Sequence, residues 1–273
     1  MGILIAAAVT SVLSLALVGG VLFYRSPRST WWVLALAILV QLPMCAAAYY
    51  GVRVPLQEGV QKLVGEGDLF GFLTTFSAPL TEEPAKLWPL LIPLFRRFAT
   101  NENRVRLAMA LGLGFGLGEI WFLAHVIFTK DPQSAGLPWY QLGGFLNERF
   151  MVCLMHGVFT ATALYVGGWR GFVGACVLHY LVNFPIYLGK IDAGGLGKET
   201  YQVLLSLWVA IYFIGMLALL AFMSAGNWQV GKMIFGEATC PDCQTVYPRP
   251  LLGLNLGPKR YERCPHCRKW HLL

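Results

Sequence analysis

Seven polar side chains interrupt strongly apolar stretches of this 273-residue chain. They are Glu82, Glu83, Lys86, Glu119, His156, His179 and Asn183. Carboxylates and imidazoles transfer protons or bind metal ions, and an amide can donate to a developing oxyanion. His179 and Asn183 are spaced i, i+4, so they share one face of a helix. These residue types are candidates for acid–base or metal-assisted chemistry.

The stretches that carry these residues are apolar enough to cross a membrane. The chain is 56% hydrophobic and 13% charged, with a mean hydropathy of +0.58, whereas soluble domains are about a quarter charged. A helix needs about 20 mostly apolar residues to cross the hydrocarbon core. The sequence therefore predicts an all-α integral membrane protein with about seven spans, near 2–24, 31–52, 68–95, 107–129, 144–167, 171–189 and 201–223.

The distribution of Lys and Arg predicts the orientation of these spans. With the C-terminus inside, fourteen of these residues fall in inner segments and five in outer ones. Cytoplasmic loops carry the excess of positive charge. We therefore expect a multi-pass protein of the cell membrane, with its N-terminus outside and its C-terminus in the cytoplasm. The net charge of +7 suits an anionic lipid leaflet, and no nucleic-acid partner is expected.

Depth in the membrane groups most of the polar residues together. Counting from the inner ends at 1.5 Å per residue, Glu83, Glu119 and Asn183 lie roughly 18 Å deep, His156 roughly 16 Å and His179 roughly 12 Å. These positions fall on four spans and within about one helical turn of each other. An ionisable group in hydrocarbon costs several kcal/mol and marks a functional site by default. We therefore expect the five side chains to meet.

Three other polar residues lie nearer the outer boundary. His125, Glu148 and Arg149 come out roughly 27–28 Å from the inner face by the same helical rise. Residues at that level form interfacial salt bridges or extend their charged ends into the headgroups. We expect them at the rim of the membrane domain, with a role at the substrate entrance as the alternative.

The acidic pair has a local environment that favours proton transfer. Lys86 is i, i+4 from Glu82 and i, i+3 from Glu83, so it can offset one carboxylate. Adjacent carboxylates at low dielectric cannot both ionise cheaply, which favours a general acid or base. Pro84 removes a helical hydrogen bond. We expect a half-helix that begins near Thr81 and holds both glutamates in its first turn, where the helix dipole favours anions.

The next span carries glycine at every second position. These residues are Gly112, Gly114, Gly116 and Gly118. Small residues allow helices in a membrane to pack closely. The alternative is that the two glycines nearest Glu119 leave room for a substrate backbone.

The C-terminal segment 236–273 has the spacing of a four-cysteine zinc ribbon. Cys240 and Cys243 form one Cys-x-x-Cys turn, and Cys264 and Cys267 form a second. Two such turns close a tetrahedral zinc site, and metal binding supplies folding energy to domains of this size. The alternative is free or disulfide-bonded cysteines, but a cytoplasmic location favours thiols. Three further cysteines are expected to pack inside spans as small apolar side chains: Cys45, Cys153 and Cys176.

Four motifs stand in order on four successive predicted spans. They are Glu82-Glu83-x-x-Lys86, Phe115-x-x-x-Glu119, a lone His156, and His179-x-x-x-Asn183. Together they resemble the PrsW branch of the CAAX-protease/bacteriocin-processing superfamily of intramembrane proteases. The resemblance covers about residues 70–190 of the predicted membrane domain 1–225. Relatives with prenylated substrates carry an arginine one position later in the first motif and a histidine in place of Glu119, so this sequence favours the PrsW-like branch.

The resemblance implies an endopeptidase that acts on membrane-associated proteins, such as transmembrane regulators. It implies that a glutamate of the first motif activates water, and that the histidines and the asparagine position the water and stabilise the oxyanion. Two histidines and a glutamate are also a zinc ligand set, yet the His-Glu-x-x-His motif is absent. A metal-free glutamate base is favoured, and a zinc-dependent site stays open.

Two functions of other classes are compatible with the same residues. Buried Glu, His and Lys form proton relays in ion-coupled transporters, but the two halves of the sequence show no internal repeat of the kind common in those proteins. A catalytically silent membrane scaffold that docks partners through the ribbon is the other reading.

Overall fold

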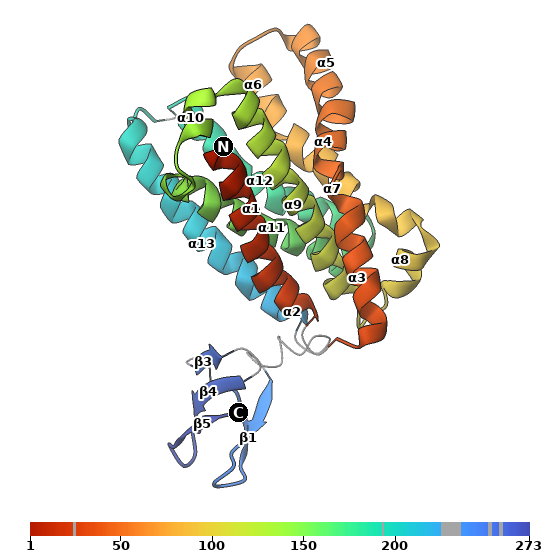
Figure 1. The fold of residues 1–273 in the computed structure, drawn as a ribbon, viewed down its shortest axis with the longest axis vertical. Coiled ribbons are helices and arrows are strands. Elements are labelled where there is room, and N and C mark those ends of the chain that lie inside the picture. The colour runs from red at the N-terminus through yellow and green to blue at the C-terminus, as the bar shows by residue number, and fades with distance from the viewer. Residues whose placement is uncertain (24–25, 193, 225–235, 251–252, 257–258) are drawn as a thin grey trace.

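The computed structural model describes residues 1–23, 26–192, 194–224, 236–250, 253–256 and 259–273. It shows a helical bundle followed by a small C-terminal β region (Figure 1). The prediction of a helical membrane protein with a small cysteine-bearing C-terminal unit is confirmed. The predicted domain boundary at residue 225 lies outside the described residues, as do Arg25 and Lys232 of the charge count.

Within the described residues, six helical stretches are long and apolar enough to cross a membrane. Several consist of consecutive elements: α1 (Gly2–Ser14) continues through a π-helical turn into α2 (Gly20–Phe23). The six stretches are Gly2–Phe23, Arg28–Val64, Arg104–Lys130, Gly143–Val166, Gly168–Lys190 and Lys198–Ser224. The last four are α9, α11, α12 and α13.

The predicted span 31–52 is longer in the structure. The helical stretch Arg28–Val64 comprises α3 (Arg28–Gln41), a turn at Leu42 and Pro43, and further helical segments. Those segments are α4 (Met44–Ala48), the π-helical Tyr49–Arg53 and α5 (Val54–Val64). Arg53, expected in an outer loop, therefore lies within a helical stretch.

The predicted span over 68–95 is interrupted in the structure, as its prolines indicated, but not at the expected place. The chain forms α6 (Asp68–Thr75), α7 (Ser77–Leu87), a 3-10 turn at Trp88–Leu91 and α8 (Pro93–Phe98). Prolines remove helical hydrogen bonds along this segment. Figure 1 shows α6 beside α5 at one end of the bundle and α8 near α3 at the other, so the segment still crosses the bundle.

The half-helix that was expected to begin near Thr81 begins earlier. α7 begins at Ser77 and continues through Pro84, so Glu82 and Glu83 lie beyond its first turn. Pro79 sits in that first turn, where a backbone N–H would have no helical partner in any case. The helix is therefore interrupted before and after α7, and not within it.

A buried glutamine supports the far end of α7. Pro89 has no N–H to bond the carbonyl of Ala85. The Gln41 side chain donates instead to the carbonyls of Ala85, at 3.3 Å, and Lys86, at 2.8 Å. Gln41 is fully buried. It therefore ties α3 to the helix that carries the acidic pair.

The centre of the bundle is α9, whose residues from Val105 to Gly118 are continuously buried. It packs against α11, α3 and α1. A Cβ added to Gly112 would lie 2.4 Å from the backbone of Gly157, and one added to Gly118 would lie 2.1 Å from the carbonyl oxygen of Leu42. Gly114 and Gly116 meet α3 and α11 in the same way. The glycines therefore serve close helix packing, as the first of the two readings proposed.

The outer helices expose apolar side chains over most of their surface. In α13, Leu207, Ile211 and Ile214 are more than half exposed. An apolar surface of this extent needs a nonpolar environment. This fits a helix that faces lipid.

The β region contains two small antiparallel sheets. Glu262 is fully buried between them and accepts hydrogen bonds from Tyr247, at 3.1 Å, and Arg249, at 2.9 Å. The first sheet is β1 (Glu237–Thr239) with β2 (Val246–Pro248), and the second is β3 (Gly253–Leu256), β4 (Lys259–Arg263) and β5 (Trp270–Leu272).

We expect Gly118→Ala to destabilise the bundle by about 1–3 kcal/mol, because the added methyl group must displace the backbone of the neighbouring helix. Unfolding in mixed detergent micelles measures the loss. Gly215→Ala in α13 is the matched control, because nothing lies within 4 Å of its added Cβ. Equal stability of the two variants would contradict the packing role of Gly118.

Candidate functional site: a buried charged cluster on four helices

The core of the site is a buried triad centred on α7. Lys86 Nζ lies 2.5 Å from Glu83 Oε1, and the same oxygen lies 2.6 Å from His179 Nδ1 on α12. Lys86 is 0% exposed and Glu83 is 1% exposed. A buried charge requires a compensating partner, and each of these charges has one. Glu83 therefore holds both Lys86 and His179 in place.

Glu82 belongs to a separate pair. Its Oε1 forms an ion pair with Arg53, whose Nε also donates to Thr81 Oγ1 at 3.3 Å. Its Oε2 is buried and has no hydrogen-bond partner within the described residues. That oxygen lies 3.8 Å from His179 Nε2 and 4.0 Å from His156 Nε2. A gap of this size between polar atoms can admit a bridging water.

The third acidic residue connects the cluster to α11. Glu119 Oε2 lies 2.7 Å from His156 Nε2, and Glu119 Oε1 accepts from Arg149 at 2.9 Å. Arg149 also pairs with Glu148, which is largely exposed. The chain Glu148–Arg149–Glu119–His156 therefore runs from the surface to the buried lysine.

The neighbours of each histidine determine which of its two ring nitrogens carries the proton. Lys86 Nζ lies 3.1 Å from His156 Nδ1. Because an ammonium only donates, this Nδ1 accepts, and the proton on Nε2 points to Glu119. In His179, Nδ1 donates to the Glu83 carboxylate, which leaves the Nε2 lone pair facing Glu82.

Each carboxylate of the acidic pair has its own cation. Arg53 forms an ion pair with Glu82, and Lys86 forms one with Glu83. The sequence indicated that Lys86 would offset one glutamate and left the other without a partner. Arg53 supplies that partner.

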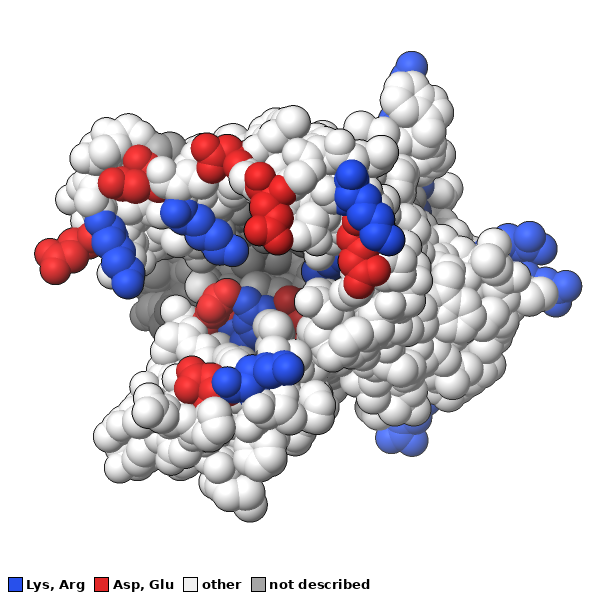
Figure 2. Space-filling view, turned by 90° about the horizontal axis from the view of Figure 1, so that it is seen from above, with Lys and Arg blue, Asp and Glu red and all other residues white. Residues whose placement is uncertain are grey.

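A cavity of about 180 Å³ lies beside the cluster, lined by Glu82, Glu119, His156, His179 and Asn183 among others. Glu83 and Lys86 are not part of its lining. Figure 2, seen from the end of the bundle where α5 and α6 lie, shows acidic and basic side chains around a hollow, with further charges inside it. Glu82 is thus the member of the acidic pair that faces open space.

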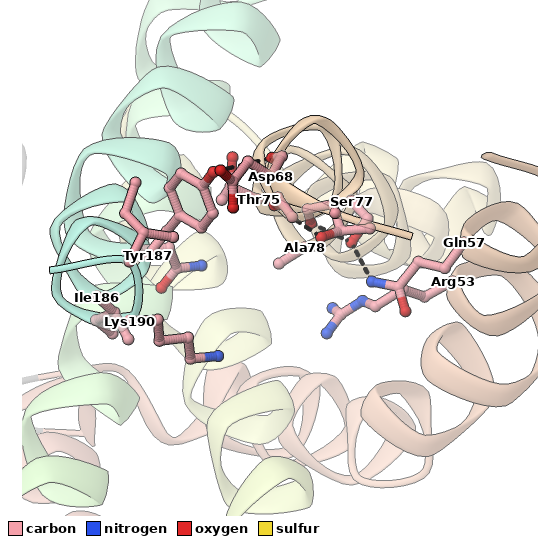
Figure 3. A pocket seen from close by; sticks show the side chains of 14 residues that line it. Arg53, Gln57, Asp68, Thr75, Ser77, Ala78, Ile186, Tyr187 and Lys190 are labelled. Carbon is pink, nitrogen blue, oxygen red and sulfur yellow. Dashed lines mark hydrogen bonds between the residues drawn. The ribbon is translucent and has the colours of Figure 1, made fainter. Parts of the chain in front are cut away.

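A second, larger cavity of about 490 Å³ adjoins the first and shares Arg53 and Asn183 with it. In Figure 3 the guanidinium of Arg53 projects into this space, with Ser77 and Gln57 on one side and Tyr187 and Lys190 on the other. Gln57 donates to Ser77 Oγ at 2.8 Å. Arg53 therefore stands where the outer cavity meets the inner one.

The structure brings six of the predicted site residues into one contact network. They are Glu82, Glu83, Lys86, Glu119, His156 and His179. Asn183 lines both cavities and makes no hydrogen bond within the described part of the chain. Their catalytic roles stay predictions.

Placement of the rim residues was partly wrong. Arg149 is 9% exposed, and its long side chain extends from the beginning of α11 into the bundle, where it bonds Glu119. Glu148 stays at the surface beside it, and His125 is exposed.

Arg53 was not identified from the sequence as a residue of the site. The available signal was an isolated arginine directly after an apolar stretch, which marks a polar site as readily as a loop.

Glu82, His156 and His179 could together offer three ligand atoms to a metal ion, all within 4.8 Å of one another. The fit is incomplete, because zinc needs a deprotonated imidazole nitrogen from each histidine. His156 uses the proton on Nε2 to bind Glu119 and directs Nδ1 to Lys86. A metal would therefore have to break one of these contacts.

The second candidate metal site is the predicted cysteine cluster. The sulfurs of Cys240 and Cys267 lie 3.5 Å apart, and those of Cys243 and Cys264 lie 3.8 Å apart. A zinc tetrahedron with Zn–S bonds of about 2.3 Å places its sulfurs about 3.8 Å apart. All four cysteines are free of disulfides. The cluster therefore could bind a metal such as zinc.

The two Cys-x-x-Cys turns have matching backbones. Gln244 donates its N–H to the carbonyl of Cys240, and Arg268 donates to that of Cys264, both at 3.0 Å. Both donors have positive φ, 56° and 61°. Hydrogen bonding to Thr245 lowers the pKa of Cys243 to about 6, which favours the thiolate that a metal requires.

Cys45 and Cys153 are both buried, and Cys153 packs in the apolar core of the bundle as expected. Cys176 is partly buried, with its thiol 3.7 Å from the carbonyl of Pro79.

We compared the chain with protein-family models, with curated proteins and with solved structures, and none of the three comparisons gave a match. Function is therefore inferred from the geometry of this site and from the motifs.

We expect Lys86→Met to destabilise the protein by about 3–5 kcal/mol, because it leaves the Glu83 charge buried without its cation. Adding Glu83→Gln should recover much of that loss, since the buried charge is then removed as well. A double-mutant cycle from unfolding in mixed micelles measures both effects. Additive losses in the double variant would contradict the pairing.

Proposed function

We propose that this protein is an intramembrane endopeptidase of the PrsW-like type, with Glu82 as the general base. The observation that carries the proposal is the unpartnered Oε2 of Glu82, which faces a cavity inside the membrane-spanning bundle. The opposite oxygen is fixed by Arg53. A carboxylate held on one side and free on the other is oriented to accept a proton.

The attacking water would bridge Glu82 Oε2 and His179 Nε2, donating one hydrogen to each. When its oxygen attacks the peptide carbonyl, Glu82 takes a proton, and the carbonyl oxygen becomes an oxyanion. The protonated Glu82 then delivers that proton to the departing amine, which balances the reaction. His179 acts as an acceptor that positions the water, because Glu83 holds its Nδ1 proton.

Oxyanion stabilisation would come from two further polar side chains that line the same cavity. Asn183 lines the cavity and has no competing hydrogen bond within the described residues. Arg53 lies at the same junction and retains donor capacity beyond Glu82 and Thr81. One well-placed donor contributes about 3–4 kcal/mol to an oxyanion transition state.

The other charged residues would act by positioning. Lys86 orients His156, and Glu119 holds the opposite nitrogen of the same ring. Arg149 fixes Glu119 in turn. This arrangement limits rotation of both histidines, and such restraint preserves the alignment of reacting groups.

The charge distribution and the position of the cavities support one orientation and one class of substrate. With the N-terminus outside and the C-terminus cytoplasmic, the hollow of Figure 2 opens at the outer side, where α5 and α6 lie. Substrates would be membrane-associated proteins, such as transmembrane regulators, presented to the site from that side.

A zinc-dependent form of the same peptidase is the nearest alternative, with Glu82, His156 and His179 as ligands. Full-chain Cys264→Ser removes a ligand of the C-terminal cluster and so allows metal at the membrane site to be measured separately. Activity that persists in this variant after exhaustive chelation supports the metal-free mechanism. Stoichiometric zinc retained there, with activity lost on its removal, supports the zinc-dependent one.

One observation supports a proton-coupled transporter as a second candidate function. Contacts between polar side chains run continuously from surface-exposed Glu148 to buried Glu83. A relay needs a further path to the opposite face of the membrane. Within the described residues, no ion pair links Glu83 or Lys86 onward to α8. The peptidase is therefore the better-supported reading.

We expect Glu82→Gln to lower cleavage of transmembrane peptide substrates by at least about a hundredfold, because a general base contributes about 10²–10⁴ in rate. Purified protein in proteoliposomes, with products identified by mass spectrometry, provides the measurement. His156→Ala should also lose activity, since it frees Lys86 and Glu119. His125→Ala is the matched control, as that residue is exposed and outside the cluster. Undiminished cleavage by Glu82→Gln would refute the assignment.

We also propose that the cysteine cluster binds a structural zinc ion. Metal analysis of the full chain should then find zinc that Cys264→Ser abolishes and that Cys176→Ser, in a helix of the bundle, retains. Lowering the pH should release the ion as the thiolates become protonated. Intramolecular disulfides in freshly purified protein, with no zinc, would contradict this proposal.

A further inference from the structure

One exposed face of the C-terminal β region combines aromatic, aliphatic and basic side chains. Strand β4 pairs with β5 in a register that sets Tyr261 opposite Leu272 and Arg263 opposite Trp270. Because side chains alternate along a strand, these four share one face. All four are exposed, while Glu262, on the opposite face, is fully buried. We call these four residues the β4–β5 face.

The aromatic pair on this face is ordered but uncovered. The rings of Tyr261 and Trp270 stack at 5.1 Å with an interplanar angle of 17°. Trp270 is 52% exposed, Leu272 is 47% exposed and Tyr261 is 41% exposed. Large apolar side chains clustered in this way mark a binding surface more often than isolated ones do.

The charge around these rings is positive. Arg263 lies on the face itself, and its Nε donates to the backbone carbonyl of Arg268 at 2.8 Å, so a second basic residue is adjacent to it. Lys269 is also exposed and forms an ion pair with Asp242 at 2.7 Å. The surface therefore offers stacked aromatic rings bordered by cations.

The membrane is always within reach of this face. The transmembrane helix α13 ends at Ser224, and β1 begins at Glu237. The intervening chain, even fully extended, spans at most about 45 Å. The β region is thus confined near the lipid surface at which α13 ends, so even weak affinity for that surface is effective.

We propose that the β4–β5 face docks on the anionic phospholipid surface of the membrane that holds the helical bundle. Trp and Tyr prefer the headgroup level of a bilayer, and each nearby Lys or Arg adds attraction to anionic lipid. A protein partner or a nucleic acid would also accept cations, but only the bilayer is held next to this face by the covalent chain. The inference is independent of the proposed peptidase activity.

Energy transfer in lipid nanodiscs tests the proposal with the full chain. A donor dye is placed at the C-terminus, and acceptor-labelled lipid is included in the disc. In discs that contain phosphatidylglycerol, transfer should exceed that in discs of phosphatidylcholine alone, and high salt should reduce the difference. Arg263→Gln should lower the ratio of docked to free β region about fivefold. Trp270→Ser should reduce docking in both salt conditions.

Val246→Ser is the matched control, because Val246 is an exposed apolar residue on the other sheet, and it should dock as the unmodified protein does. Zinc content of each variant verifies that the cysteine cluster is intact, so loss of docking is separated from loss of the fold. Equal transfer in neutral and anionic discs would overturn the proposal. So would docking that Arg263→Gln and Trp270→Ser leave unchanged. A β4–β5 face that responds only to an added acidic peptide or single-stranded nucleic acid would equally overturn it.

Discussion

The arrangement of this protein depends on neutralising charge inside a membrane. Glu83 and Lys86 are almost completely buried and 2.5 Å apart, and a buried charge without a partner costs several kcal/mol. Their pairing fixes α7, while His179 and His156 bring α12 and α11 to the same point. Arg53 and Arg149 complete the neutralisation for Glu82 and Glu119. Four helices and the segment that carries Arg53 therefore meet at one point, where their buried charges find partners of opposite sign.

Close packing makes this convergence possible. The glycines of α9 bring the backbones of α3 and α11 near enough that an added Cβ would overlap them. Glu119 and His156 can then meet across the contact between α9 and α11. On the other side, Gln41 bonds carbonyls at the end of α7. The prolines of the α6–α8 segment permit a short helix whose acidic residues face inward. The polar site thus rests on apolar and small-residue packing.

Much of this was predictable from the sequence, for physical reasons that also explain the errors. Helical rise and the positions of the apolar stretches placed Glu119, His156 and His179 at similar depths, and Cys-x-x-Cys spacing indicated the cysteine cluster. The positions of the prolines do not show at which of them the helix will be interrupted. For this reason α7 was predicted to begin near Thr81 instead of Ser77. Helical rise gives the depth of a residue's backbone but not that of the end of a long side chain, and the side chain of Arg149 extends inward to Glu119. Arg53 was missed because a helix end cannot be read reliably from hydropathy.

The proposed mechanism requires Glu82 to keep one carboxylate oxygen free to hold the reacting water. A high-resolution experimental map of the full chain in lipid tests it most directly. We expect an ordered water between Glu82 Oε2 and His179 Nε2, with Arg53 bound to the other oxygen of Glu82 and His156 bound to Glu119. A Glu82 carboxylate turned away from the cavity, with the space beside His179 closed by protein side chains, would contradict it.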